Sequence, residues 1–185
     1  MTTATHPGSE ANPKADAPLT TFTDCHVGIL KRLKSLDALP ALLEPAARAR
    51  QIAADSLVFF REAIFEHHLE EERDLFPAVL ASAQPGAERD RVQSMTERLT
   101  NEHRAIEALW KGLEKALKRV GKGQDADLDG DELHRLVTAY TAHAGFEEAE
   151  FLPLSESILG RNSNHMAALG LSLHMRHAKP VNAYI

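Results

Sequence analysis

The segment HHLEEERDLFP, which begins at His67, places two histidines and four acids just after the apolar run LVFFREAIF. If one helix continues through both runs, some of these ionisable groups must face the core. An unpaired carboxylate in a core costs at least several kcal/mol, and an unpaired buried ring costs about 1–3 kcal/mol. A metal ion reverses this penalty. Histidine and glutamate four residues apart lie only about 40° apart around a helix, so both can reach one ion.

A second copy of this segment follows later in the chain. HAGFEEAEFLP, which begins at His143, shares with the first copy the histidine, two glutamates, an apolar pair and the proline, at an offset of 76 residues. His26 in CHVGIL and His103 in EHRAIE are related in the same way, at an offset of 77 residues. The chain therefore consists of two copies of a helix pair, each with one histidine followed by His-x-x-x-Glu.

Four apolar stripes with steps of three and four residues predict inward-facing positions for these groups. Each stripe is apolar except at its histidine or glutamate positions, so the ionisable groups are expected to lie together inside one bundle. The predicted stripes are Phe22, His26, Ile29, Leu33, Leu36; Phe60, Ile64, His67, Glu71, Leu75; Leu99, His103, Ile106, Trp110, Leu113; and Leu136, Tyr140, His143, Glu147, Phe151.

The repeat also chooses between two overlapping pairs in the first copy. His68 and Glu72 have the same spacing as His67 and Glu71, but Ala144 occupies the position that matches His68. We therefore expect His67 and Glu71 to face inward and His68 to lie on the flank or in solvent. The candidate metal ligands are His26, His67, Glu71, His103, His143 and Glu147.

Six candidate ligands exceed what a tetrahedral zinc site uses, and the twofold repeat favours two ions bridged by the glutamates. Imidazole-rich ligation with carboxylates and without thiolates suits iron, and manganese or zinc also fit the ligand types. With two ferrous ions, two glutamates and a bridging hydroxide, about one positive charge remains. An anionic or reduced oxygen ligand would neutralise that charge.

The pattern resembles the hemerythrin/HHE cation-binding family over about residues 20–155. The matching elements are His26, His67 with Glu71 and LFP, His103, and His143 with Glu147 and FLP. The resemblance implies a four-helix bundle around a non-haem centre of two iron ions with an oxo or hydroxo bridge. It also implies a protein that binds dioxygen reversibly, or that senses or handles oxygen, nitric oxide or iron.

One position departs from the pattern of the oxygen-carrying members. The oxygen-carrying members resemble a five-histidine pattern, in which the third helix supplies a second histidine one turn after its first. This chain has Glu107 at that position. The expectation of an oxygen carrier is weakened accordingly. Glu107 is an additional ligand, a contact to a metal-bound water or a partly exposed helix acid. Tyr140, one turn before His143, is a ligand, a donor to a ligand or a core tyrosine.

The periodicity predicts an all-α fold. Helices are expected over 20–39, 46–82 with a kink at Pro77, 87–120 and 129–160, and the acids of DADLDGD are expected to cap the last one rather than to bind calcium. Short connections favour an up-down-up-down antiparallel four-helix bundle over 19–160. Residues 1–18 are expected to form a disordered tail, and 161–185 a short extra C-terminal helix and tail.

Composition excludes several partners. A net charge of −6 and a pI near 5.9 argue against nucleic acid, and no run of 18 apolar residues predicts a membrane span, so a cytoplasmic protein is expected. The single Cys25 cannot form an internal disulfide.

His165, His174 and His177 are expected to be exposed or to form a lid, or else a second metal site. The fifth helix could pair two chains in a homodimer; no protein partner is indicated.

Three classes of function fit this sequence. The first is a di-iron protein that binds or senses dioxygen or a related small ligand. The second is an iron or nitric-oxide stress protein or a di-iron oxidase or peroxidase, and the third is a metal-dependent interaction module. A ferritin-like oxidase is disfavoured, because its helices carry Glu-x-x-His with more carboxylates.

Overall fold

The computed structural model describes residues 18–161, with side chains from Cys25 onward. The described stretch is all-α and has no strand, as predicted. The chain divides into two compact units, Met1–Ala47 and Arg48–Ile185, which are described separately below. The predicted helix within 161–185, with its three histidines, lies outside the described residues, as does the predicted tail over 1–17.

The first unit contains helix α1 (Pro18–Asp37) and the beginning of α2 (Leu39–Phe59). Only Ala38 separates the two helices, so the predicted connection at 40–45 is wrong. Pro40 is the second residue of α2, where the missing N–H would have no intrahelical partner anyway and the ring therefore does not break the helix. Of the predicted apolar stripe of α1, Ile29, Leu33 and Leu36 are exposed within this unit.

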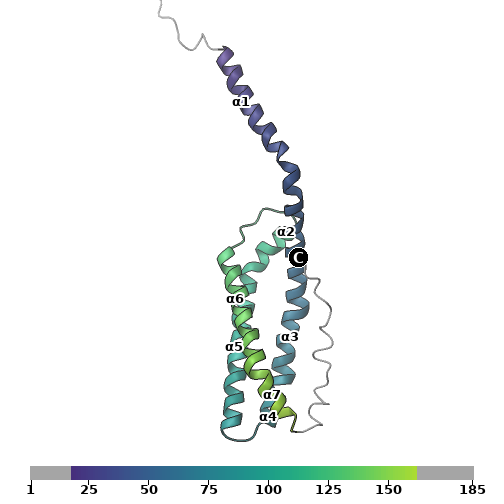
Figure 1. Ribbon diagram of the computed structural model, residues 1–185, viewed down its shortest axis with the longest axis vertical. Coiled ribbons are helices and arrows are strands. Elements are labelled where there is room, and N and C mark those ends of the chain that lie inside the picture. Colours follow the sequence, from purple (N-terminus) through teal and green to yellow (C-terminus); the bar gives the residue numbers. More distant parts are fainter. Residues whose placement is uncertain (1–17, 162–185) are drawn as a thin grey trace, which may run out of the picture. The chain divides into compact units, whose positions relative to one another are not determined.

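As far as residue 161, where the described chain ends, the second unit contains three helical rods (Figure 1). The first continues from α2 through η1 (Phe60–Ile64), α3 (Phe65–Glu70), η2 (Glu71–Leu75) and α4 (Phe76–Ser82). The second is α5 (Ala87–Gly121), and the third runs through α6 (Gly130–Phe146), η3 (Glu147–Phe151) and α7 (Leu152–Leu159). Helix α5 packs along α6, and α4 contacts both α5 and α7. The second and third rods match the predicted helices over 87–120 and 129–160 to within one residue. The first rod ends at Ser82 as predicted, but α2 begins at Leu39, seven residues before the predicted start at 46.

Three π-helical segments interrupt the rods: η1, η2 and η3. A π turn holds one more residue than an α turn, so the side chains after it are rotated relative to an unbroken helix. Segments η2 and η3 begin at Glu71 and Glu147, which correspond in the repeat. Segment η1 has no counterpart, because the matching residues 136–140 lie within the α-helix α6. The two copies therefore differ in register just before the first copy's histidines.

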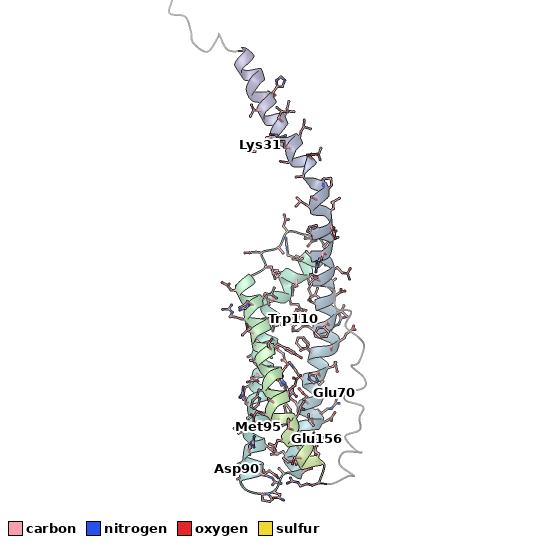
Figure 2. The ribbon with its side chains drawn as sticks, viewed as in Figure 1. Lys31, Glu70, Asp90, Met95, Trp110 and Glu156 are labelled. Atoms are coloured by element: carbon pink, nitrogen blue, oxygen red, sulfur yellow. The ribbon has the colours of Figure 1, made fainter. Side chains whose placement is uncertain are left out.

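Two apolar clusters fill the second unit. The Trp110 cluster contains Ala53, Ile106, Trp110, Leu113, Leu117 and Leu136. The Phe76 cluster contains Phe76, Val79, Ala83, Val92, Met95, Leu99, Phe151, Ile158 and Leu159. Trp110 and Met95, one from each cluster, lie at different heights along α5 (Figure 2). On every rod a few histidines and glutamates fall between the residues of the two clusters. They form a polar layer that comprises His67, His68, Glu71, His103, His143 and Glu147.

Helix α6 begins with a side-chain cap, as the acid-rich segment predicted. The carboxylate of Asp129 accepts hydrogen bonds from the backbone N–H of Asp131 at 2.9 Å and of Glu132 at 3.0 Å. Asp129→Ala is expected to lower the free energy of unfolding by about 1 kcal/mol, because two helix donors lose their acceptor. Denaturant unfolding measures this change. Asp127→Ala, in the exposed loop before the cap, is the control, and an equal loss in both variants would contradict the assignment.

No helix within residues 18–161 combines the length and apolar character needed to cross a membrane.

Candidate metal centre

The polar layer contains two groups of side chains whose ligand atoms converge. In each group the candidate ligand atoms lie within 4.8 Å of one another. One group consists of His68, His103 and His143, all buried. The other consists of His67, Glu71 and Glu147, in which both glutamates are buried and His67 is half-buried. Five of the six predicted ligands are thus brought together by the three rods of the second unit.

His103 is held by a carboxylate on the neighbouring rod. Its Nδ1 lies 2.8 Å from Oε1 of Glu72, and since a carboxylate can only accept, Nδ1 carries the proton and donates. Glu72 is in turn bound by Arg104, which also donates to Glu107 at 2.9 Å. Burial lowers the pKa of His103, but its contacts with Glu71 and Glu72 outweigh burial, and the net shift is upward.

His143 is held in the same way by α5. Its Nδ1 donates to Oε2 of Glu102 at 3.1 Å, and Glu102 accepts from Arg98 at 2.7 Å. The Arg98 guanidinium also lies 3.6 Å above the ring of Phe146, which fixes its position further. Burial lowers the pKa of His143 despite the bond to Glu102. The two histidines therefore share one arrangement, an imidazole bound to a glutamate that is bound to an arginine.

This arrangement leaves the other ring nitrogen free to bind a cation. With Nδ1–H donated to glutamate, Nε2 of His103 and of His143 carries a lone pair whenever the ring is neutral. Neither Nε2 has a hydrogen-bond partner among the described residues, although both are buried. A buried polar atom without a partner costs about 1–3 kcal/mol, and a metal ion would remove that cost. The donor set therefore fits a bound cation, with each histidine oriented by a carboxylate, as is usual for metal-binding imidazoles.

Glu71 lies between the two groups. Its Oε1 is 3.3 Å from Nε2 of His67, and its Oε2 is 3.3 Å from Nε2 of His103. Glu147 is buried beside it, with Oε2 3.9 Å from Nε2 of His143. Burial, followed by the neighbouring Glu71 carboxyl, raises the pKa of Glu147 to about 8. Two carboxyl groups this close and this dry cannot both ionise cheaply without a compensating cation.

A family model agrees with this geometry. The model of the Hemerythrin HHE cation binding domain matches residues 17–155. The chain belongs to the hemerythrin HHE cation-binding family. Comparison with curated proteins and with solved structures gave no match. The family resemblance inferred from the repeat is thereby confirmed, and cation binding in the polar layer of this HHE domain is compatible with the His/Glu clusters.

His68 does not lie where the repeat predicted. Its side chain is only 1 % exposed, whereas the side chain of His67 is 40 % exposed, so the prediction of a flank or solvent position for His68 is wrong. The physical reason is η1, which rotates the following residues in the first copy only. Burial, with the nearby His103 and His143, lowers the pKa of His68 to about 3, so the ring is neutral.

The remaining candidate site residues, His26, Glu107 and Tyr140, differ in where they lie relative to the polar layer. His26 lies on α1 in the first unit, where it is exposed, and its place among the ligands stays a prediction. Glu107 is paired with Arg104, and its Oε1 is 3.8 Å from Nδ1 of His68. The Tyr140 ring centroid lies 6.3 Å from that of His68 and 5.9 Å from that of His143, and burial raises the pKa of the phenol.

The sequence reasoning missed the residues that orient the candidate ligands. Glu102 precedes His103 directly but supports His143, and Glu72 was considered only as a partner of His68. A signal was present in α5, because Arg98 and Glu102 are spaced as an i, i+4 pair and Arg104 follows two residues later. The rod that each acid faces depends on how the helices pack, and sequence spacing alone does not determine that packing.

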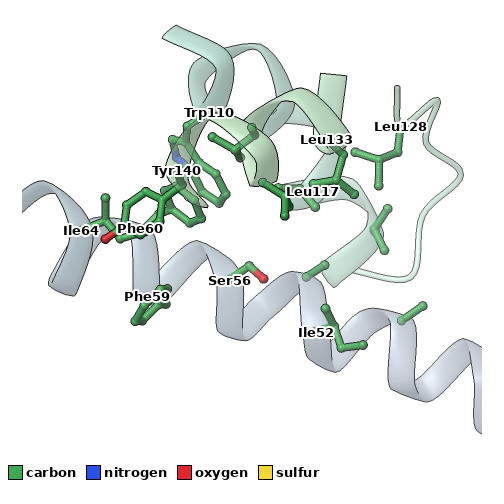
Figure 3. A pocket seen from close by; sticks show the side chains of 15 residues that line it. Ile52, Ser56, Phe59, Phe60, Ile64, Trp110, Leu117, Leu128, Leu133 and Tyr140 are labelled. Carbon is green, nitrogen blue, oxygen red and sulfur yellow. The ribbon is translucent and has the colours of Figure 1, made fainter. Parts of the chain in front are cut away.

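An apolar cavity of about 470 Å³ opens beside the polar layer. Ile52, Phe60 and Ile64 of the first rod face Leu117 and Leu133 across it (Figure 3). Phe60 stacks on Trp110 with ring centroids 3.7 Å apart, and Tyr140 lines the wall nearest the histidines. The cavity offers an apolar environment in which a small uncharged molecule could bind close to the candidate metal-binding side chains.

Proposed function

We propose that this HHE domain binds two metal ions in the polar layer, with iron favoured and manganese or zinc compatible, and binds or senses dioxygen or a related small ligand. The observation that carries the proposal is the pair of buried Nε2 atoms on His103 and His143, which make no hydrogen bond among the described residues and belong to rings fixed by a carboxylate at Nδ1. Glu71 and Glu147 add the negative charge that two cations require.

The proposed ligands are His26, His67, Glu71, His103, His143 and Glu147, with Glu107 and Tyr140 as additional candidates. The family's four-helix bundle, in which the first helix supplies His26, is part of this proposal. Iron, when bound, supplies the electrons for reversible ligand binding or for turnover. The protein's own residues hold the imidazoles in one tautomer, keep the carboxylates dry and place an apolar cavity beside them.

The test is metal analysis with an optical spectrum of the anaerobically reduced protein before and after oxygen is admitted. About two irons per chain and a spectrum that changes on oxygenation would support the proposal. A change that reverses on deoxygenation favours a carrier or sensor. Turnover of peroxide would instead favour the alternative, a di-iron oxidase or peroxidase or an iron or nitric-oxide stress protein. Absence of metal bound by these residues would contradict the proposal.

Metal uptake is expected to release protons. Glu147, with its pKa raised to about 8, holds a proton at pH 7 and must lose it before its carboxylate binds a cation, and the raised pKa of His103 acts in the same direction. His68 is already neutral and contributes none. The apparent affinity for metal should therefore rise from pH 6.5 to 8.5. Titration with metal in a weakly buffered solution that contains a pH indicator measures the protons released. An affinity for metal that falls as pH rises would contradict the prediction.

A further inference from the structure

Among the described histidines that the family pattern does not use, His68 is the one that is buried. Its side chain is 1 % exposed, and neither Nδ1 nor Nε2 has a hydrogen-bond partner among the described residues. The nearest charged atom, Oε1 of Glu107, is 3.8 Å from Nδ1, which is too far for a hydrogen bond. A core histidine with a purely structural role normally has at least one partner, so this ring lacks the contacts expected of that role.

The surroundings of His68 supply two further imidazoles. The rings of His68 and His103 stack with centroids 3.9 Å apart and planes 6° from parallel, and the His143 ring stands edge-on at 5.6 Å. His103 and His143, each with an Nε2 that has no hydrogen bond among the described residues, belong to the same group, in which one ring nitrogen from each histidine lies within 4.8 Å of the others. Three buried imidazoles thus converge without any group to receive their lone pairs, a donor set typical of a transition metal.

The second group differs in chemistry, because it combines one imidazole with two carboxylates. Glu71 contacts both groups, at 3.3 Å to His67 and 3.3 Å to His103. We propose that His68 is a metal ligand and that, with His103 and His143, it forms a three-histidine cation position beside the His67, Glu71 and Glu147 position. The proposal rests on the proposed function and makes the two positions unequal, in contrast to the symmetry of the sequence repeat.

The test is titration of the metal-free full chain with Co²⁺, followed by metal analysis and by optical spectra. The variants are His68→Ala, His67→Ala and, as a matched control, His134→Ala on the exposed surface of α6. Loss of one equivalent in His68→Ala, or weakening of that equivalent by about tenfold or more, supports the proposal. His67→Ala should affect the other equivalent, and His134→Ala should bind like the wild type.

The outcomes separate the two proposals. If His68→Ala binds both equivalents unchanged while Glu147→Gln loses one, His68 is not a ligand and the proposed function stands. If the wild type binds no Co²⁺ or Fe²⁺, both fail. Should His68→Ala fail to fold, X-ray absorption of wild-type protein with one Co²⁺ decides: three imidazoles around the ion support the proposal, and fewer refute it.

Discussion

Replacing Glu147 by glutamine is expected to stabilise the metal-free protein and to weaken its binding of metal. Glu147 is 6 % exposed, and the pKa of its carboxyl, about 8, lies above the 4.5 of the unfolded chain. Between these values the folded state holds a proton that the unfolded state has lost, so the stability of the metal-free protein falls as pH rises from 4.5 to 8. Each unit of pKa corresponds to about 1.4 kcal/mol, which sets an upper bound of roughly 5 kcal/mol.

Glutamine cannot ionise, so the variant should be more stable than the metal-free wild type at pH 8.5 and about equal to it at pH 5. With metal present, the wild type is expected to be the more stable of the two proteins. A cation at about 100 times its dissociation constant stabilises the folded state by about 2.7 kcal/mol. The variant binds metal more weakly and loses part of this stabilisation. Thermal unfolding with and without metal, at both pH values, measures the effect. Glu148→Gln changes an exposed neighbour and is the control; a variant less stable than the metal-free wild type at pH 8.5 would contradict the burial argument.

The third predicted stripe shows what sequence periodicity can give. Leu99, His103, Ile106, Trp110 and Leu113 are all buried, as predicted. They lie on α5, an α-helix of 35 residues without interruption, so a constant period holds from end to end. The fourth stripe agrees as well, since Leu136, His143, Glu147 and Phe151 are buried and Tyr140 is half-buried.

The second stripe shows where periodicity fails. Across η2 the buried positions step by five, from Glu71 to Phe76, and Leu75, predicted to be inward, is only half-buried. A π turn depends on how neighbouring rods pack, and the apolar pattern alone does not reveal it. The π turn at η1 likewise rotates the residues that follow it. The comparison of His68 with Ala144, which assumes an unbroken helix, therefore predicted the wrong side of the helix for His68. The family and the convergence of five of the six predicted residues could therefore be inferred from residue types and spacing, whereas which of the two adjacent histidines is buried could not.

The acids that orient the histidines should control metal affinity without changing metal stoichiometry. Glu102→Ala removes the acceptor of His143 Nδ1–H, and Glu72→Ala does the same for His103. Each ring could then turn or shift its proton to Nε2, the atom that would face the cation. Loss of such a partner typically weakens metal binding about 10–100-fold, and we expect that range for each variant.

Glutamine at either position separates orientation from charge. Its amide oxygen can still accept from Nδ1–H, but it lacks the negative charge that makes the imidazole a stronger donor to a cation. We therefore expect Glu102→Gln to bind more weakly than the wild type and more tightly than Glu102→Ala, with competition against a chelator as the measurement. Glu97→Ala, on the exposed face of the same helix, is the control. If Glu102→Ala binds metal as tightly as Glu97→Ala, the carboxylate does not orient a ligand, and the free Nε2 of His143 needs another explanation.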